Sequence, residues 1–236
     1  MLIDRIARIR EAERRYHDDC YENEVLFQEG SWLHKPVKTV MELFDQTVPR
    51  NDMRLLDLGC GVGRNSIPLA LKLLGSGGKI VCVDLLESAI RHLSGYSRQY
   101  GVSTMLETHI ADIGAFPIEP GQYDYIYSVS ALEHLDSAAT FDRVLTDMIE
   151  GTREQGIHCL IISSNISETE PATGERLEPM FELLMDTETL NGLLYSKYDG
   201  WRVIKHTVKP YETEIAREGK PVRLRGDVVT WAAQKV

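Results

Sequence analysis

The stretch LLDLGCGVGRNSIPLA, residues 55–70, places three glycines within five positions directly after an apolar run. Gly59, Gly61 and Gly63 follow Asp57, so the pattern is an acid and then G-x-G-x-G. A strand that ends in glycines and leads into a helix presents backbone N–H groups at the carboxyl edge of a sheet, where α/β proteins bind nucleotides. The spacing differs from the G-x-G-x-x-G of dinucleotide sites, and the acid would repel a pyrophosphate. The stretch therefore predicts a site for a nucleotide-like ligand that carries positive charge.

Apolar runs around this loop predict the elements that position it. From Met53 onward, short apolar runs alternate with helical stretches, a pattern typical of a parallel sheet with helices on both faces. The expected strands cover residues 54–58, 79–83, 104–110, 123–129 and 157–163. The expected helices cover residues 65–74, 87–100, 137–151 and 187–196. Two β-rich runs, 201–214 and 222–233, flank the turn sequence AREGKP and predict an antiparallel hairpin that closes the sheet.

The N-terminal segment completes the expected fold. Apolar residues recur at helical spacing within the first nine positions, which predicts an amphipathic helix. This helix either packs on the domain as a structural element or covers a pocket as a lid. We expect an α/β, Rossmann-like, doubly wound fold with a mostly parallel seven-stranded sheet, a C-terminal antiparallel hairpin and an N-terminal helical lid. The chain, 1–236, would form a single domain, with residues 1–50 as the helical cap and 51–236 as the core.

The composition argues against several classes of function. The chain has 26 Lys and Arg residues against 36 Asp and Glu residues, a formal net charge of −10, which disfavours nucleic-acid binding because phosphates are held by clustered cations. No run approaches the ~20 apolar residues of a membrane span, and the charged N-terminus does not resemble a signal peptide, so we expect a cytoplasmic protein that does not contact a membrane. The four cysteines lie far apart without metal-ligand spacing, which indicates reduced thiols and no metal site. A small-molecule partner is expected.

The acid and G-x-G-x-G motif resembles the first motif of the class I S-adenosylmethionine-dependent methyltransferases. The resemblance implies that Asp84, in KIVCVDLLESAI, takes both ribose hydroxyls of the donor, and that Asp112, in THIADIGAFP, lies near its adenine amino group. The fourth strand, in YDYIYSVSALEHLD, would end where the methionine part of the donor meets the methyl acceptor. The donor would be S-adenosyl-L-methionine and the product S-adenosyl-L-homocysteine. The donor-binding residues implied in this way are Asp57, Gly59, Cys60, Gly61, Gly63, Asn65, Asp84, Leu85, Asp112, Ile113, Ser128 and Val129.

A closer resemblance is to the tellurite-resistance methyltransferases, in which G-R-N-S after the glycines is characteristic, as in GRNS at residues 63–66. The C-terminal segment, from YDGWRVIKHTVKPYETEI to the end, is also similar to the final hairpin of that family. Members that methylate the oxyanion carry a His-Arg pair in the first hairpin strand, whereas the nearest positions here are Glu214 and Ile215. The resemblance therefore implies the fold of that subgroup more strongly than its substrate.

These features predict a methyltransferase that acts on a small molecule carrying a thiol, hydroxyl, amine or oxyanion. A base that takes the acceptor's proton could be His134, Tyr16 or His34, whereas an oxyanion acceptor would need a cation, for which Lys35 and Arg176 are candidates. Residues 16–35 and 168–185 are expected to form the acceptor site, with solvated surface loops as the alternative. Two other functions stay open: a domain that binds the donor without transferring its methyl group, and an NAD-dependent enzyme. The protein would be a monomer or a homodimer.

Overall fold

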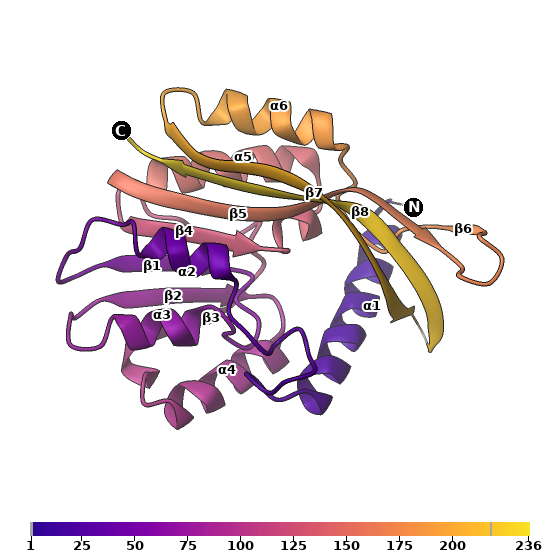
Figure 1. The fold of residues 1–236 in the computed structure, drawn as a ribbon, viewed down its shortest axis with the longest axis horizontal. Coiled ribbons are helices and arrows are strands. Elements are labelled where there is room, and N and C mark those ends of the chain that lie inside the picture. Colours follow the sequence, from indigo (N-terminus) through magenta and orange to yellow (C-terminus); the bar gives the residue numbers. More distant parts are fainter. Residues whose placement is uncertain (1, 218) are drawn as a thin grey trace.

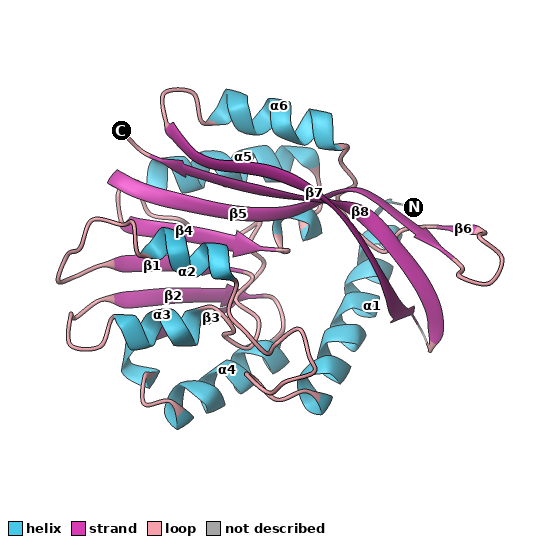
Figure 2. Cartoon of the chain, in the orientation of Figure 1, coloured by secondary structure: helices cyan, strands magenta, loops and turns pink. Residues whose placement is uncertain are grey.

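The computed structural model describes residues 2–217 and 219–236, with side chains from Arg5 onward. Within these residues one sheet has the strand order β3–β2–β1–β4–β5–β8–β7, and β6 pairs with the far end of β5 (Figures 1 and 2). The strands β1 to β5 are parallel to one another, and β8 and β7 are antiparallel. This confirms the predicted mostly parallel sheet with its C-terminal hairpin, to which the short β6 adds an eighth strand. The strands are β1 (Arg54–Leu58), β2 (Lys79–Asp84), β3 (Leu106–Ile110), β4 (Tyr123–Val129), β5 (Thr152–Thr169), β6 (Arg176–Leu177), β7 (Arg202–Arg217) and β8 (Lys220–Gln234).

The carboxyl ends of β1 and β4 meet where the strand order reverses. Leu58, at the end of β1, is in register with Val83 of β2 on one side and with Ser128 of β4 on the other. The chain runs outward from β1 to β2 and β3, and then returns to β4 and β5 on the opposite side. Ligands of open α/β sheets bind at such a switch point, outside the carboxyl ends of the strands. The glycine loop that follows β1 therefore lies at the expected binding edge.

The buried strands carry apolar side chains on both faces of the sheet, so helices cover both faces. Leu55 and Leu56 are both fully buried, although they point to opposite faces, because successive strand side chains alternate. The last two helices begin at capping residues, since Ser137 and Asp186 accept hydrogen bonds from backbone N–H groups of the first turn. One face is covered by α2 (Lys38–Phe44), α3 (Ser66–Lys72) and α4 (Glu87–Gln99), and the other by α5 (Ala138–Gly151) and α6 (Thr187–Lys197).

Helix α1 (Leu2–Asn23) lies across the carboxyl edge of the parallel strands. Figure 1 shows α1 between that edge and the curved ends of β7 and β8. Ile9 on this helix is fully buried, whereas several of its arginines and acids are partly exposed. The predicted amphipathic helix is confirmed, and its position over the binding edge is the one that a lid requires.

The polar segment after Asn165, which lies outside the expected strands, is partly β-strand. β5 is 18 residues long and continues to Thr169. Beyond a bulge that follows Ser164, this extension pairs with β8, for example Thr169 with Arg223. Pairing with a distant strand, and not an apolar pattern of its own, makes this segment extended. The longer β5 carries the hairpin past the body of the sheet, toward α1.

Candidate active site

The glycine loop passes close to the segment that follows β4. Gly59 has a φ of +80°, which favours glycine, and a Cβ at this position would lie 2.2 Å from the Cβ of Ala131. The backbone N–H groups of Gly59 and Cys60 both donate to the carbonyl of Val83, at 2.9 and 3.0 Å. A Cβ on Gly61 would lie 3.2 Å from the hydroxyl of Tyr21, which α1 contributes. The loop is therefore fixed on one side to β2 and is covered on the other by α1.

Asp57 lies beneath this loop and is 2% exposed. Its Oδ2 accepts a hydrogen bond from the hydroxyl of Ser66 at the start of α3, and that hydroxyl lies 3.2 Å from the hydroxyl of Tyr127. Burial raises the pKa of Asp57 to about 7, because the hydrogen bonds from Ser66 and Tyr127 offset only part of the desolvation. Asp57 thus braces the turn between β1 and α3, and its direct contact with the donor stays a prediction.

Asp84, at the end of β2, holds the glycine loop from the other side. Its Oδ2 accepts from the N–H of Gly61 at 2.8 Å, and its Oδ1 accepts from the N–H of Leu86 at 2.9 Å. Burial raises the pKa of Asp84, against the lowering effect of these two amides. A carboxylate has roughly four acceptor positions, so each oxygen keeps capacity for a further donor such as a ribose hydroxyl.

Asp112, in the loop after β3, is contacted by α1. Its Oδ1 accepts from the N–H of Gly114 at 2.8 Å, and its Oδ2 accepts from Nη2 of Arg10 at 2.7 Å. Ile113, beside it, is 9% exposed. The residue predicted to lie near adenine therefore already has a cationic partner, which the sequence did not reveal because Arg10 is 102 positions away.

The other predicted donor residues surround the same edge but differ in what their side chains contact. Cys60 is buried beside the loop, Leu85 is exposed, and Val129 packs on the core. Asn65 accepts a hydrogen bond from the backbone N–H that precedes α2 (2.9 Å), and Ser128 donates to the last carbonyl of β1 (2.9 Å). The side chains of Asn65 and Ser128 thus serve the fold, and only contacts through their backbone or surface remain for a ligand.

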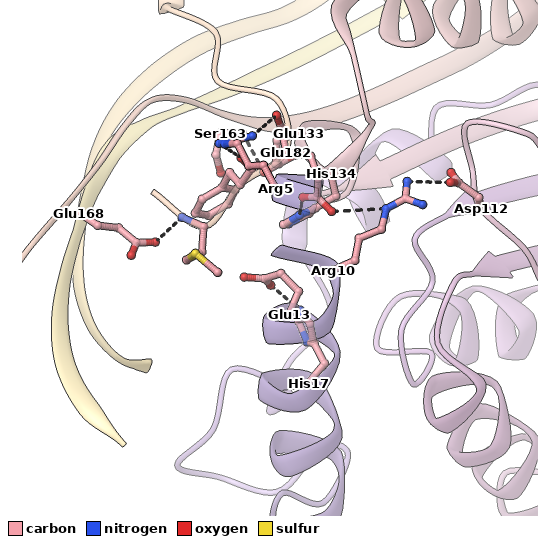
Figure 3. Close-up of polar contacts among 12 residues, drawn as sticks. Arg5, Arg10, Glu13, His17, Asp112, Glu133, His134, Ser163, Glu168 and Glu182 are labelled. Atoms are coloured by element: carbon pink, nitrogen blue, oxygen red, sulfur yellow. Dashed lines mark hydrogen bonds and ion pairs between the residues drawn. The ribbon is translucent and has the colours of Figure 1, made fainter. Parts of the chain in front are cut away.

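His134, just beyond β4, belongs to a second group of polar residues (Figure 3). Its Nδ1 lies 2.8 Å from Oε2 of Glu182, and its ring stacks on Phe181 with a centroid distance of 5.2 Å. Burial lowers the pKa of His134, but the hydrogen bond to Glu182 and the charges of Glu13 and Glu133 outweigh it and raise the pKa to about 9. In this structure His134 is therefore an imidazolium at neutral pH, and it must lose a proton before it can act as the base predicted from the sequence.

Glu13 of α1 forms the other half of this group. Nη1 of Arg217 lies 2.5 Å from Oε1 of Glu13, and Nη2 of Arg217 lies 3.2 Å from Oε1 of Glu168. Burial raises the pKa of Glu13, but the neighbouring His17, whose Nε2 lies 3.6 Å from Oε2 of Glu13, and the charges of His134 and Arg217 outweigh it and lower the pKa to about 2. Helix α1, the extension of β5 and the end of β7 are thus joined by buried charge pairs.

We refer to Glu13, His134, Glu168, Glu182 and Arg217 as the α1 cluster. His134 was singled out from the sequence as a catalytic residue, and Glu168 and Glu182 fall in the segment predicted to form the acceptor site. Glu13 and Arg217 were missed. No local motif could have found this pair, because its partners are 204 positions apart.

The remaining predicted catalytic residues are placed differently. Tyr16 lies beside the α1 cluster, with the guanidinium carbon of Arg217 at 5.8 Å from its ring centroid. Burial raises the pKa of Tyr16 to about 12, so its hydroxyl stays protonated at neutral pH. His34 lies in the loop before α2, where its Nε2 is 3.8 Å from Glu29. The structure thus brings Tyr16, but not His34, to the cluster.

Helix α1 is tied to the protein on both of its flanks. Toward the body of the sheet, Arg10 pairs with Asp112 and the hydroxyl of Ser88 donates to Asp18. Toward the other side, Glu13 pairs with Arg217. Arg5 contacts the segment before α6: its Nε lies 3.0 Å from Glu178, and its Nη2 donates to the carbonyl of Phe181 at 2.9 Å. The helix therefore bridges the predicted donor residues and the α1 cluster.

Three further features of the described residues complete the description. No group of three or more His, Cys, Asp or Glu side chains in this part of the chain is arranged to hold a metal ion. The four cysteines are unpaired, and three of them are buried. None of the described helices combines the length and the apolar character needed to cross a membrane.

Comparisons with known proteins agree with this geometry. Residues 49–219 match the family model described as "Methyltransferase domain". The ubiquinone biosynthesis O-methyltransferase of Marinobacter nauticus is 27% identical over 119 residues, which are 50% of this chain and 48% of the relative, so the match spans about half of each protein. Among similar solved structures, TehB from Haemophilus influenzae has a TM-score of 0.64 and 22% identity, and the match covers 85% of this chain and 62% of TehB. A SAM-dependent methyltransferase from Methanosarcina mazei has a TM-score of 0.59 and 18% identity, and the match covers 82% of this chain and 97% of that protein. The likeness to TehB agrees with the resemblance found in the sequence. The chain belongs to the class I S-adenosylmethionine-dependent methyltransferases.

Proposed function

We propose that the carboxyl edge of β1, β2 and β4 is the site where this methyltransferase holds S-adenosylmethionine. Asp84 would accept the ribose hydroxyls, and the loop at Asp112 and Ile113 would take the adenine. The residues fit this ligand: both oxygens of Asp84 keep acceptor capacity, and the backbone of Gly61 is free of a side chain where the donor must pass. When bound, S-adenosylmethionine supplies a methyl group on a positively charged sulfur, and the buried carboxyl of Asp57 is placed to favour that charge.

We propose further that the acceptor is a small molecule. The observation that carries this proposal is the position of α1, which crosses the binding edge and is tied on both flanks by Arg10 and Glu13. A helix fixed in this way leaves little access for a folded protein or a nucleic acid. The net charge of −10 also gives no attraction for a polyanion.

Within this class, the charges of the α1 cluster favour a neutral acceptor such as a hydroxyl over an oxyanion. Arg217 is already engaged by two carboxylates, and His134 by a third. Lys35 and Arg176, the cations considered from the sequence, are both exposed. Within the α1 cluster, an anionic acceptor would therefore find no cation without a carboxylate partner. The activity of the relatives named O-methyltransferases supports the same choice.

The test is transfer of a tritiated methyl group from S-adenosylmethionine into a size-fractionated bacterial extract. The wild type should label the low-mass fraction, and Asp84→Asn should lose most of that label. Asp199→Asn, a change at an exposed turn, is the matched control and should label normally. Label in the protein fraction would overturn the small-molecule proposal. Donor binding with no label in any fraction, including one supplemented with phenols, thiols and amines, would favour a domain that binds the donor without transferring its methyl group.

A further inference from the structure

Arg10 lies between the predicted donor residue Asp112 and Glu182 of the α1 cluster, and one of its N–H groups has no hydrogen-bond partner. Its Nη2 is bound to Oδ2 of Asp112 at 2.7 Å, as described above. Its Nε faces Oε1 of Glu182 at 3.7 Å, which is too long for a hydrogen bond. This Nε is buried and has no hydrogen-bond partner. A buried donor without an acceptor is unfavourable, so Arg10 gains a hydrogen bond from any small shift toward Glu182.

Glu182 lies between Arg10 and His134 and interacts with both. The side chain of Glu182 is 3% exposed, and its two oxygens face different cations: Oε1 faces Arg10 and Oε2 faces Nδ1 of His134 (Figure 3). The two cations share one carboxylate in a site with little water, where charge interactions are strong. A closer contact with Arg10 therefore weakens the hold of Glu182 on the proton of His134.

Other charges also face His134, and they define its resting state. They are Glu13 from α1, Glu133 from its own turn and Asp84 from β2, beside Glu182 from the segment before α6. Each of them is held by groups other than Arg10: Glu13 by Arg217, Glu133 by the N–H of Ser163, and Asp84 by two backbone amides. Of the carboxylates near His134, Glu182 is thus the one whose interaction with His134 depends on the position of Arg10.

We propose that Arg10 is a positioning residue that couples occupation of the donor site to the protonation of His134. The inference rests on the proposed donor site. An adenine amino group that donates to Oδ2 of Asp112 shares this oxygen with Arg10 and weakens the contact of Arg10 with it. The loosened guanidinium then closes on Glu182 through its Nε. His134 then gives its proton to solvent and becomes a neutral imidazole. It can now take the proton of the acceptor hydroxyl, while the methyl–sulfur bond breaks with its electron pair on sulfur and the new methyl–oxygen bond forms.

This order of events has a chemical consequence. Without the donor, His134 is an imidazolium, and no acceptor hydroxyl loses its proton at the site. With the donor, His134 would become a neutral base. Arg10 thereby restricts acceptor activation to the loaded enzyme.

The experiment follows the side-chain nitrogen resonances of His134 by NMR between pH 6 and 10, with and without saturating S-adenosylhomocysteine. This product lacks the sulfonium charge, so a shift cannot arise from that charge. His134→Gln assigns the signal, and calorimetry measures binding separately. In the wild type, the pKa of His134 should fall by about one on binding. In Arg10→Met it should not fall, whereas Arg15→Met, which removes an exposed α1 arginine paired with Glu11, should behave as wild type.

The possible results separate this inference from the proposed function. If S-adenosylhomocysteine binds and the pKa of His134 stays constant, or falls equally in Arg10→Met, the coupling is wrong and the donor site stands. If S-adenosylhomocysteine fails to bind the wild type, both are wrong. Should Arg10→Met fail to fold, Glu182→Gln gives the same test. His134 should then titrate at a lower pH and respond no further to binding, and a remaining response would contradict the coupling.

Discussion

The edge proposed to hold the donor, with Asp57, Asp84 and Asp112 and called here the donor edge, lies beside the α1 cluster. The contacts of the two regions are of different kinds. At the donor edge, acids bind backbone amides close to them in the sequence, as Asp84 does with Leu86 and Asp112 does with Gly114. In the α1 cluster, side chains pair across the whole chain, as Glu13 does with Arg217. The first arrangement can be encoded by a short sequence motif. The second exists only after the hairpin and α1 have folded against each other.

The two regions also differ in how their charges are balanced. Burial raises the pKa of both Asp57 and Asp84. The hydrogen bonds that these acids accept offset only part of this effect. In the α1 cluster, neighbouring cations lower the pKa of Glu13 to about 2 in spite of burial. The donor edge is thus suited to receive a positively charged ligand, whereas the acids of the cluster are already paired with its own cations.

The largest effect is expected from a side chain at Gly59. Gly59→Ala should destabilise the fold by about 4 kcal/mol, because it adds strain at positive φ and a clash with Ala131. Thermal and urea unfolding measure the change. Gly95→Ala is the control, since Gly95 lies within α4 with open space around it, and it should be neutral or stabilising by up to about 1 kcal/mol. Equal stability of the two variants would show that the loop does not pass Ala131 closely.

Breaking the charge pairs of the α1 cluster should have the next largest effect. Arg217→Met leaves Glu13 and Glu168 buried without their cation, which should lower the free energy of unfolding by about 3 kcal/mol. Adding Glu13→Gln should recover part of the loss, because one unpaired charge is removed. Urea unfolding of the single and double variants measures this. A loss below about 0.5 kcal/mol, the range of exposed ion pairs, would show that α1 is not held by these pairs.

A loss of donor binding is expected at Asp84. Asp84→Asn should weaken S-adenosylhomocysteine binding by about 2 kcal/mol, or roughly 30-fold, because charge-assisted hydrogen bonds to the ribose become weaker. Calorimetry with Asp199→Asn beside it measures the difference. Unchanged affinity would remove Asp84 from the donor site.

The smallest effect is a pH dependence that distinguishes the donor from the product. The pKa of Asp57 is raised to about 7, so its carboxyl group loses its proton as the pH rises from 6 to 8. The ionised form attracts the sulfonium, and the ratio of S-adenosylmethionine to S-adenosylhomocysteine affinity should rise about five-fold over this range. The same raised pKa means that the free energy of unfolding of the free protein falls as the pH rises from about 4 to about 7, and falls no further once Asp57 is ionised in the folded state. In Asp57→Asn the affinity ratio should not depend on pH, and a ratio that still rises there would assign the effect to another group.

The sequence could predict that the residues of the donor edge lie at one edge of the sheet because that information is local, and their contact with the donor stays a prediction. The glycine loop, Asp84 and Asp112 each follow a strand, and the sheet order brings those strand ends to one edge. The contact of Arg10 with Asp112 could not be predicted, because it depends on where α1 crosses the sheet. The extension of β5 was missed for a similar reason, since its polar residues become a strand only through pairing with β8. His134 was found by its place after β4, but its protonation depends on Glu13 and Glu182, which belong to other elements.

A crystal structure of the protein with S-adenosylhomocysteine tests the central claim most directly. We predict the ribose hydroxyls on Asp84, the adenine amino group on Asp112, and α1 still across the edge with the guanidinium of Arg10 against Glu182. A ligand bound elsewhere, or one bound at this edge without contact to Asp84, would contradict the account.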